Sequence, residues 1–187
     1  MRMHRRGFFV GLMMAAFATP LAAAPASNLK DTVYLFTKNG RVTIQLRPDL
    51  APKAVAQIET LTKKGFYNGL TFHRVIAGFM AQTGDPTGTG SGGSKLPNLP
   101  AEFTSTPFKR GTIGMARTSD PNSANSQFFI CFAPAPFLNG KYTVVGQVVA
   151  GMDIVDKIKK GSEADNGTVA NPDKIVKMEM ASAAAAH

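Results

Sequence analysis

The chain contains the stretch Phe72-His73-Arg74-Val75-Ile76-Ala77-Gly78-Phe79-Met80-Ala81-Gln82-Thr83-Gly84-Asp85. Residues 72–76 send alternate side chains to two faces, the pattern of a half-buried strand. Gly78 then bends the chain, and the second half adds apolar side chains and an amide. The stretch thus sets one permanent cation, Arg74, beside an apolar patch. This combination suits an enzyme whose reaction breaks no covalent bond.

A second block follows about thirty residues later, and the two blocks together resemble a known family. It reads Gly114-Met115-Ala116-Arg117-Thr118-Ser119-Asp120-Pro121-Asn122-Ser123-Ala124-Asn125-Ser126-Gln127-Phe128-Phe129-Ile130. The first block resembles the pattern F-H-R-[VI]-I-x-G-F-M-x-Q-x-G-D of the cyclophilins, the peptidyl-prolyl cis-trans isomerases. The second resembles their M-A-[NR]…S-Q-F-F-I motif. Flanking matches extend the resemblance from about Val33 to Met180.

The rest of the chain reads as short strands with two helices. Alternation predicts strands over residues 32–37, 41–46, 111–116, 127–132, 143–149 and 174–180. One helical pattern starts at Pro52 and ends at Gly65, and a second covers residues 152–160. Many short strands indicate a barrel or a sandwich, and periodicity alone does not choose. The resemblance implies a mainly β fold, a closed eight-stranded antiparallel β-barrel capped by two α-helices. Side chains fill such a barrel, so we expect the substrate in an outer groove.

Residues 1–26 are predicted to be a cleavable signal peptide. Three Arg precede an apolar stretch from Gly7 to Leu21, and Ala24-Pro25-Ala26 supplies small residues for cleavage before Ser27. A membrane anchor is the alternative, but the stretch is shorter than the about 20 residues of a spanning helix and contains Pro20. Arg5-Arg6 also resembles a twin-arginine signal, so the export route stays open. Residues 27–180 form one predicted domain, and the Ala-rich residues 181–187 form a flexible tail.

Charge, cysteine content and the Gly-rich loop give no clear sign of nucleic-acid binding, a disulfide or a nucleotide site. The formal charge of +9 falls to +6 when residues 1–26 and their three Arg are removed. The remaining Lys and Arg are scattered without interleaved aromatic residues, which gives weak support for nucleic-acid binding. Cys131 is the only cysteine, and its apolar surroundings predict a buried thiol. The Gly84–Gly93 loop lacks the Gly-Lys-Ser/Thr ending of a nucleotide loop and is interpreted as a permissive surface loop.

The resemblance implies prolyl isomerisation, which needs no proton carrier. Rotation about an X–Pro bond crosses a barrier of about 18–20 kcal/mol, because resonance stiffens the amide. In the twisted amide the prolyl nitrogen becomes basic, so a hydrogen-bond donor aimed at it favours the transition state. We predict that Arg74 is the catalytic donor. His73 alternates to the other face of its strand and is interpreted as a hydrogen-bonded structural residue.

The family's substrate-binding residues carry over to nine positions. The resemblance assigns a proline-ring pocket to Phe79, Met80, Phe129 and Leu138, and directs the neighbouring Phe128 into the barrel interior. Gln82 is expected to hold a substrate carbonyl and to keep Arg74 in place. The backbone of Ala116 and Arg117 is expected to pair with an extended substrate. Phe137 and Tyr142 complete the site, at positions where many eukaryotic members carry Trp and His.

The sequence thus predicts a peptidyl-prolyl cis-trans isomerase that acts on proline-containing segments of exported, folding proteins. It is expected to be a periplasmic or secreted monomer that uses no cofactor or metal and binds neither nucleic acid nor, after cleavage, a membrane. The alternative is a non-catalytic peptide-binding or chaperone module with the same fold, against which the Arg74 cation argues. The clients are not given by the sequence.

Overall fold

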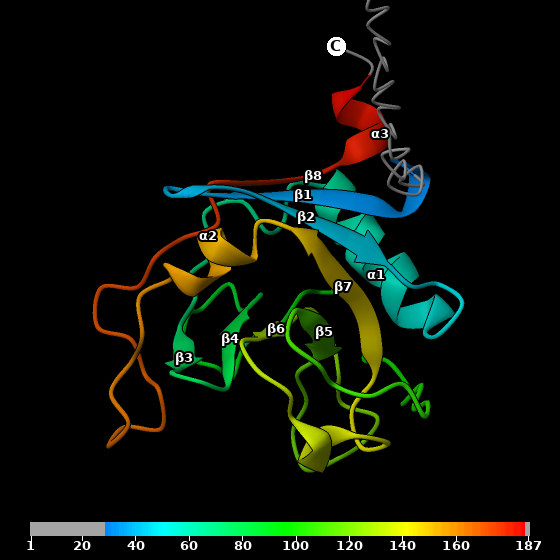
Figure 1. The fold of residues 1–187 in the computed structure, drawn as a ribbon. Helices are drawn as coiled ribbons and strands as arrows, with labels where there is room; N and C mark the ends of the chain where they lie inside the picture. Colours follow the sequence, from blue (N-terminus) through cyan, green and yellow to red (C-terminus); the bar gives the residue numbers. More distant parts are fainter. Residues whose placement is uncertain (1–28, 186–187) are drawn as a thin grey trace, which may run out of the picture.

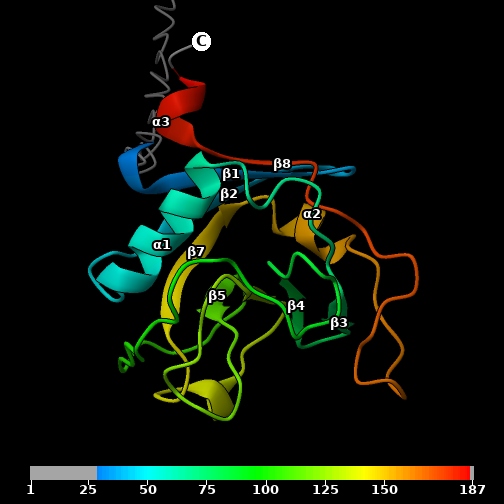
Figure 2. The ribbon, with the colours of Figure 1, turned by 180° about the vertical axis from the view of Figure 1, so that it is seen from behind.

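The computed structural model describes residues 29–185, and the predicted signal peptide lies outside them. One antiparallel sheet of eight strands dominates the fold, in the spatial order β3-β4-β6-β5-β7-β2-β1-β8. Figures 1 and 2 show this sheet curling round, with β1, β2 and β8 lying across the top and α1 and α2 on opposite sides of the curl. The strands are β1 (Thr32–Thr37), β2 (Gly40–Leu46), β3 (Arg74–Ile76), β4 (Met80–Thr83), β5 (Thr112–Met115), β6 (Phe128–Cys131), β7 (Val144–Ala150) and β8 (Lys177–Met180).

The expected closed barrel is wrong, because the sheet is open between its edge strands β3 and β8. An irregular segment, residues 161–175, covers the opening instead. Its backbone bonds β3 on both sides of Arg74: the Val75 N–H donates to the Gly167 carbonyl at 2.8 Å, and Val169 donates to His73 at 3.1 Å. Asn166 and Asn171 have left-handed backbones within this segment. These left-handed positions and Pro172 prevent a continuous strand, so β8 starts only at Lys177.

Helix α1 (Pro52–Lys63) packs its apolar face into the core, with Val55, Ile58 and Leu61 all buried. Pro52 suits the first helical turn, where its missing N–H is not needed. No local side chain caps the helix, and Glu102 does so from a distance. Its carboxylate accepts the N–H groups of Lys53 and Ala54 at 3.1 and 2.9 Å. The helix end and the loop around Glu102 therefore hold each other.

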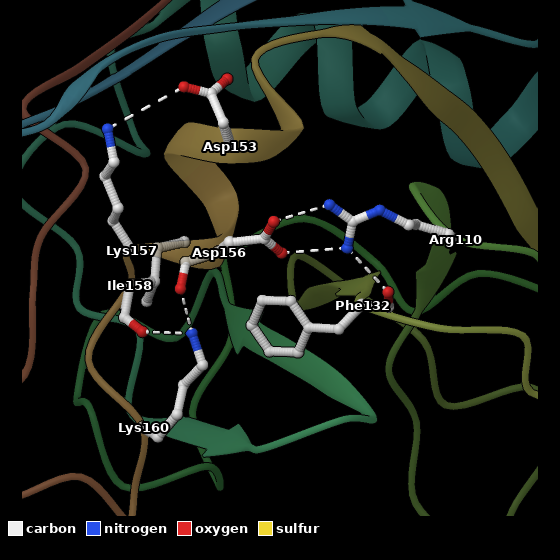
Figure 3. A network of polar contacts seen from close by, with 7 residues as sticks. All are labelled: Arg110, Phe132, Asp153, Asp156, Lys157, Ile158 and Lys160. Carbon is white, nitrogen blue, oxygen red and sulfur yellow. Dashed lines mark hydrogen bonds and ion pairs between the residues drawn. The ribbon is translucent and has the colours of Figure 1, made fainter.

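Helix α2 (Met152–Asp156) is shorter than the predicted range 152–160. The backbone groups that would extend it have other partners, as the Lys159 N–H donates to the Asp173 carboxylate at 3.0 Å. The Lys160 ammonium donates to the carbonyls of Asp156 and Ile158. Figure 3 shows Lys160 against the Phe132 ring and Arg110 bridging the Asp156 carboxylate to the Phe132 carbonyl. These contacts tie α2 to the end of β6.

Two apolar clusters divide the sheet into an inner and an outer face. The larger cluster fills the curl and contains Phe128 together with Val33, Val75 and Ile130. The smaller cluster lies on the other face of β4 and β6 and is made of Met80, Phe108, Phe129, Cys131, Ala135, Leu138 and Val144. Phe128 and Phe129 thus point to opposite faces, as expected of neighbours on a strand. The outer cluster forms the floor of the site described below.

Short helical turns complete the described chain. They are η1 (Leu29–Asp31), η2 (Pro136–Leu138) and α3 (Ala181–Ala184). Part of the predicted Ala-rich tail is thus a helical turn, and Ala181 is buried in it. No helix within residues 29–185 is long and apolar enough to cross a membrane.

Candidate active site

A groove of about 360 Å³ lies on the outer face of the curled sheet. Strands β3, β4 and β6 supply its base, the chain after β5 one wall, and the η2 turn with the following loop the other. The ten residues predicted from the sequence all line it: Arg74, Phe79, Met80, Gln82, Ala116, Arg117, Phe129, Phe137, Leu138 and Tyr142. The structure therefore brings them together, while the action of each on a substrate stays a prediction.

Strand register explains why residues distant in sequence meet in the groove. Arg74 on β3 pairs with Gln82 on β4, and Gln82 pairs with Phe129 on β6. Residues in one such row point to the same face of a sheet. The next partner in the row is Gly114 on β5. A Cβ atom at this glycine would lie 2.5 Å from the Phe129 ring, so glycine makes room for the ring.

The Arg74 guanidinium is held by three hydrogen bonds. Its Nη1 donates to Gln82 Oε1 at 3.2 Å, its Nε to the Asn166 carbonyl at 3.0 Å, and its Nη2 to Asn166 Oδ1 at 3.0 Å. Partial burial lowers the pKa of Arg74, against a smaller opposing effect of Tyr142. The ordinary pKa of arginine is so high that the side chain stays charged at neutral pH. The site thus contains a permanent, oriented cation.

Gln82 connects this cation to the Gly-rich loop. Its Nε2 donates to Gln127 Oε1 at 2.8 Å, and Gln127 Nε2 donates to the carbonyls of Gly90 and Gly92 at 2.9 and 2.8 Å. Asp85 organises the same loop from inside. The buried Asp85 carboxylate accepts backbone N–H groups from residues 87, 89, 90 and 92. The loop interpreted as merely permissive is therefore built around one aspartate.

Hydrogen bonds to the Asp85 carboxylate outweigh its burial. Burial by itself raises the pKa of an aspartate, but the bonds from Thr87, Gly92 and Gly90 stabilise the charged form. The net effect lowers the pKa of Asp85 to about 2. The carboxylate is thus ionised at any physiological pH.

Aromatic rings in mutual contact form most of the apolar part of the groove. Phe129 stacks on Phe108 with ring centroids 5.7 Å apart and meets the Tyr142 ring edge-on at 5.9 Å. Phe79 packs against Phe137 at 5.3 Å. Met80, Phe129 and Leu138 are buried, whereas Phe137 is 61% exposed and forms the rim. This part of the groove suits a small apolar ring.

Arg117 forms the opposite rim, where its guanidinium lies 4.4 Å from the Tyr142 ring centroid. It donates to the carbonyls of Lys141 and Thr118 at 2.9 and 2.8 Å. A second cavity of about 350 Å³ adjoins the groove and shares Gln82, Ala116 and Arg117 with it. Arg117 therefore stands on the ridge between an apolar and a polar depression.

His73 is buried on the face away from the groove. Neither ring nitrogen makes a hydrogen bond of good geometry within residues 29–185, and the Thr71 backbone is a group that favours the protonated ring. Burial lowers the pKa of His73, while the nearby Asp85 acts in the opposite direction. Cys131 is also buried, and burial raises the pKa of its thiol to about 12. Both groups are uncharged at neutral pH.

Sequence reasoning missed three residues that support the site: Asp85, Gln127 and Asn166. The first two stand within the quoted motifs, where their types alone could have suggested hydrogen bonding. Asn166 precedes Gly167, and an Asn-Gly pair indicates a left-handed turn. Nothing in the sequence shows that this turn lies beside Arg74. Among residues 29–185, no group of three or more His, Cys, Asp or Glu is placed to hold a metal ion.

An oriented guanidinium beside an apolar pocket, on the outside of a curled antiparallel sheet, defines a β half-barrel with an open groove on its outer face. Comparison with known families shows which family of such proteins the chain belongs to. The family described as cyclophilin type peptidyl-prolyl cis-trans isomerase/CLD matches residues 32–180. The chain therefore belongs to the cyclophilin-type peptidyl-prolyl cis-trans isomerases, and it is an isomerase.

Relatives and solved structures agree with this membership. The chain is 60% identical over 180 residues to a probable peptidyl-prolyl cis-trans isomerase of Brucella suis, covering 90% of each chain. Its structure is similar to the cyclophilin AquaCyp293 from Hirschia baltica, with a TM-score of 0.74 and 28% identity, covering 82% of this chain and 74% of that one. It is also similar to a cyclophilin-type isomerase of Cryptosporidium parvum studied with the dipeptide Ala-Pro, with a TM-score of 0.73 and 29% identity, covering 80% and 98%.

Proposed function

We propose that the groove on the outer face of the sheet binds proline-containing polypeptide segments and accelerates rotation of their X–Pro bonds. The observation that carries this proposal is the meeting of an oriented, charged Arg74 with a pocket of apolar rings in one groove. The Ala-Pro dipeptide named for the Cryptosporidium parvum structure supports the substrate class. The reaction breaks no covalent bond, so the groove needs no nucleophile or proton carrier.

Arg74 supplies the catalytic hydrogen bond in this proposal. As the X–Pro amide twists, resonance is lost and the prolyl nitrogen gains a lone pair. A guanidinium N–H aimed at that nitrogen bonds the twisted amide more strongly than the planar one. This difference lowers the barrier, because only interactions stronger in the transition state speed a reaction.

The other groove residues place the substrate around that bond. Met80, Phe129 and Leu138, with Phe79 beside them, bury the proline ring. One Nε2 hydrogen of Gln82 bonds Gln127, which leaves the other for a substrate carbonyl. The Ala116 N–H donates to the Gln127 carbonyl at 2.9 Å, so the Ala116 carbonyl is the group that faces the substrate backbone. Phe137 and Tyr142 form the rim against which the flanking peptide lies.

The substrates are segments of exported proteins that fold outside the cytoplasm, and the protein acts there as a monomer. The proposed location rests on the sequence of residues 1–26, whose basic start, apolar stretch and small residues are typical of a cleavable signal. Uncatalysed prolyl isomerisation takes tens to hundreds of seconds, slow enough to limit folding in any compartment. Fractionation of cells producing the full chain tests the location, which a cytoplasmic, uncleaved protein would contradict.

The activity is tested by following the cis-to-trans decay of a tetrapeptide containing one Ala-Pro bond. The protein lacking residues 1–26 should shorten the decay in proportion to its concentration. NMR titration with the same peptide should shift amide signals along β4, β6 and the η2 turn, and leave those of β1 and β8 unchanged. Peptide binding without faster decay would contradict the proposal and favour a non-catalytic peptide-binding module.

A further inference from the structure

Three of the N–H groups of the Arg74 guanidinium are engaged within the protein, and two remain for a substrate. A guanidinium has five N–H groups in one plane. Three of them are engaged: Nε and one Nη2 hydrogen with Asn166, and one Nη1 hydrogen with Gln82. Among the described residues no other partner is found, so one hydrogen on Nη1 and one on Nη2 are left for the substrate.

Two of the three restraining bonds come from a single residue, Asn166, which lies 92 positions along the chain from Arg74. Its main-chain and side-chain oxygens accept from the Nε–H and Nη2–H groups, which lie side by side on one edge of the guanidinium, both at 3.0 Å. Two parallel bonds fix the rotation of a planar group, whereas one bond leaves it free to pivot. Gln82, at 3.2 Å, restrains the opposite end.

The turn that carries Asn166 is held firmly against β3. Asn166 and Gly167 both have left-handed backbones, with φ of 53° and 83°. The Gly167 N–H donates to the Ser162 carbonyl at 2.7 Å, and the Gly167 carbonyl accepts from Val75 at 2.8 Å. A Cβ atom on Gly167 would lie 2.5 Å from the Ile76 side chain. Asparagine is among the few residues that tolerate the left-handed backbone and also offer a side-chain oxygen.

We infer that Asn166 is a positioning residue for catalysis: it holds the Arg74 guanidinium so that its two remaining donors face the twisted X–Pro bond. This inference rests on the proposed role of Arg74. Asn166 does not line the groove, so it acts only through Arg74. Loss of the Asn166 side chain should lower kcat and leave KM nearly unchanged, because the pocket for the proline ring stays intact.

The test is the variant Asn166→Gly, which removes the Oδ1 acceptor but keeps the left-handed backbone and the main-chain acceptor. We expect kcat to fall roughly fivefold, the range of one hydrogen bond, with a melting temperature close to that of the wild type. The matched control is Asn171→Gly, since Asn171 lies in the same segment with φ of 52° and is not among the hydrogen-bond partners of Arg74. The control should retain wild-type kcat.

A double-mutant cycle separates positioning from a general loosening of the segment. In an Arg74→Ala background, Asn166→Gly should cause no further loss. An equal loss in both backgrounds, wild-type kcat in Asn166→Gly, or an equal loss in Asn171→Gly would each overturn the inference. Inactive wild-type protein, or full activity in Arg74→Ala, would instead refute the proposed function itself, so the two failures are distinguishable.

Discussion

Arg74 and His73 show how one strand separates two kinds of chemistry. They are neighbours on the chain, yet the first lines the groove and the second is buried on the other side of β3. The cation keeps its charge in a half-buried place because the ordinary pKa of arginine is very high, and three acceptors orient it. The histidine stays neutral because burial lowers the pKa of His73 more than the nearby Asp85 raises it. The two side chains therefore place a charged group in the groove and a neutral one away from it, as the proposed mechanism requires.

Replacing Arg74 by Ala should lower kcat/KM by about 10²–10³-fold, because a donor aimed at the transition state contributes about 2.7–4 kcal/mol. The tetrapeptide assay measures this loss, and thermal unfolding checks that the fold is intact. Arg47→Ala is the matched control, since Arg47 is an exposed arginine paired with Asp49 far from the groove. Near-normal turnover in a folded Arg74→Ala protein would contradict the assignment.

At the scale of elements, the Gly-rich loop and α2 are held in different ways. The loop has few apolar contacts and depends on the Asp85 carboxylate at its centre, which gathers four backbone N–H groups. A Cβ atom on Gly92 would lie 2.1 Å from Asp85, so the loop closes tightly over the carboxylate. Helix α2 instead combines a buried apolar residue, Val155, with the ionic contacts of Arg110 in Figure 3.

Asp85→Ala should lower the free energy of unfolding by about 3 kcal/mol, since it leaves several loop N–H groups without their charged acceptor. It should also raise KM, because Gln127 bonds two carbonyls of the same loop and holds Gln82 in the groove. Urea unfolding and the peptide assay measure the two effects. Asp49→Ala, at an exposed aspartate, serves as the control. Wild-type stability in Asp85→Ala would show that the loop does not depend on this carboxylate.

Apolar packing should hold α2 more strongly than its ion pair does. Arg110→Ala should cost less than about 1 kcal/mol, because the Arg110 and Asp156 side chains are both 45% exposed and solvent weakens their attraction. Val155→Ala should cost about 2 kcal/mol, since Val155 is fully buried. Chemical denaturation of both variants gives the comparison. A larger loss in Arg110→Ala than in Val155→Ala would reverse this order.

At the scale of the whole molecule, the open curled sheet explains why the site lies outside. Side chains of the larger apolar cluster fill the interior of the curl, as in small closed barrels, and leave no room there for a peptide. The groove instead uses the outer face of β3, β4 and β6, where the smaller cluster provides a rigid floor. Global stability and the shape of the site are therefore set by the same strands.

Stability should fall as the pH is lowered, in two separate ranges. Burial lowers the pKa of His73 below its ordinary value of 6.5, so the unfolded chain binds this proton more readily. The stability that His73 contributes is present above pH 6.5 and is lost as the pH falls towards the pKa of the folded state. For Asp85 the pKa falls from 3.8 to about 2, so its contribution is present above pH 3.8 and is lost as the pH falls through about 2.

Urea unfolding between pH 8 and pH 2 tests both ranges. The free energy of unfolding should fall first below pH 6.5, as His73 is protonated, and again below pH 3.8, as Asp85 is protonated. His73→Gln should remove the step nearer neutrality and leave the acid step. The same variant should change kcat/KM far less than Arg74→Ala does. An unchanged profile in His73→Gln would mean that the folded protein accepts the proton on His73 without cost.

The sequence by itself, through its resemblance to the family, determined the family, the approximate position of most strands and the ten residues that line the groove. Two long motifs carry seven of these residues, the family resemblance extends to Phe137, Leu138 and Tyr142 beyond them, and strand alternation separates Phe129 from Phe128. Only the tertiary structure decided that the sheet is open, that Asp85 organises a loop, and that His73 lies buried without a hydrogen bond of good geometry. It also placed Asn166 against Arg74 across 92 positions. Local patterns report the periodicity of one segment, whereas contacts between distant segments depend on how the whole sheet curls.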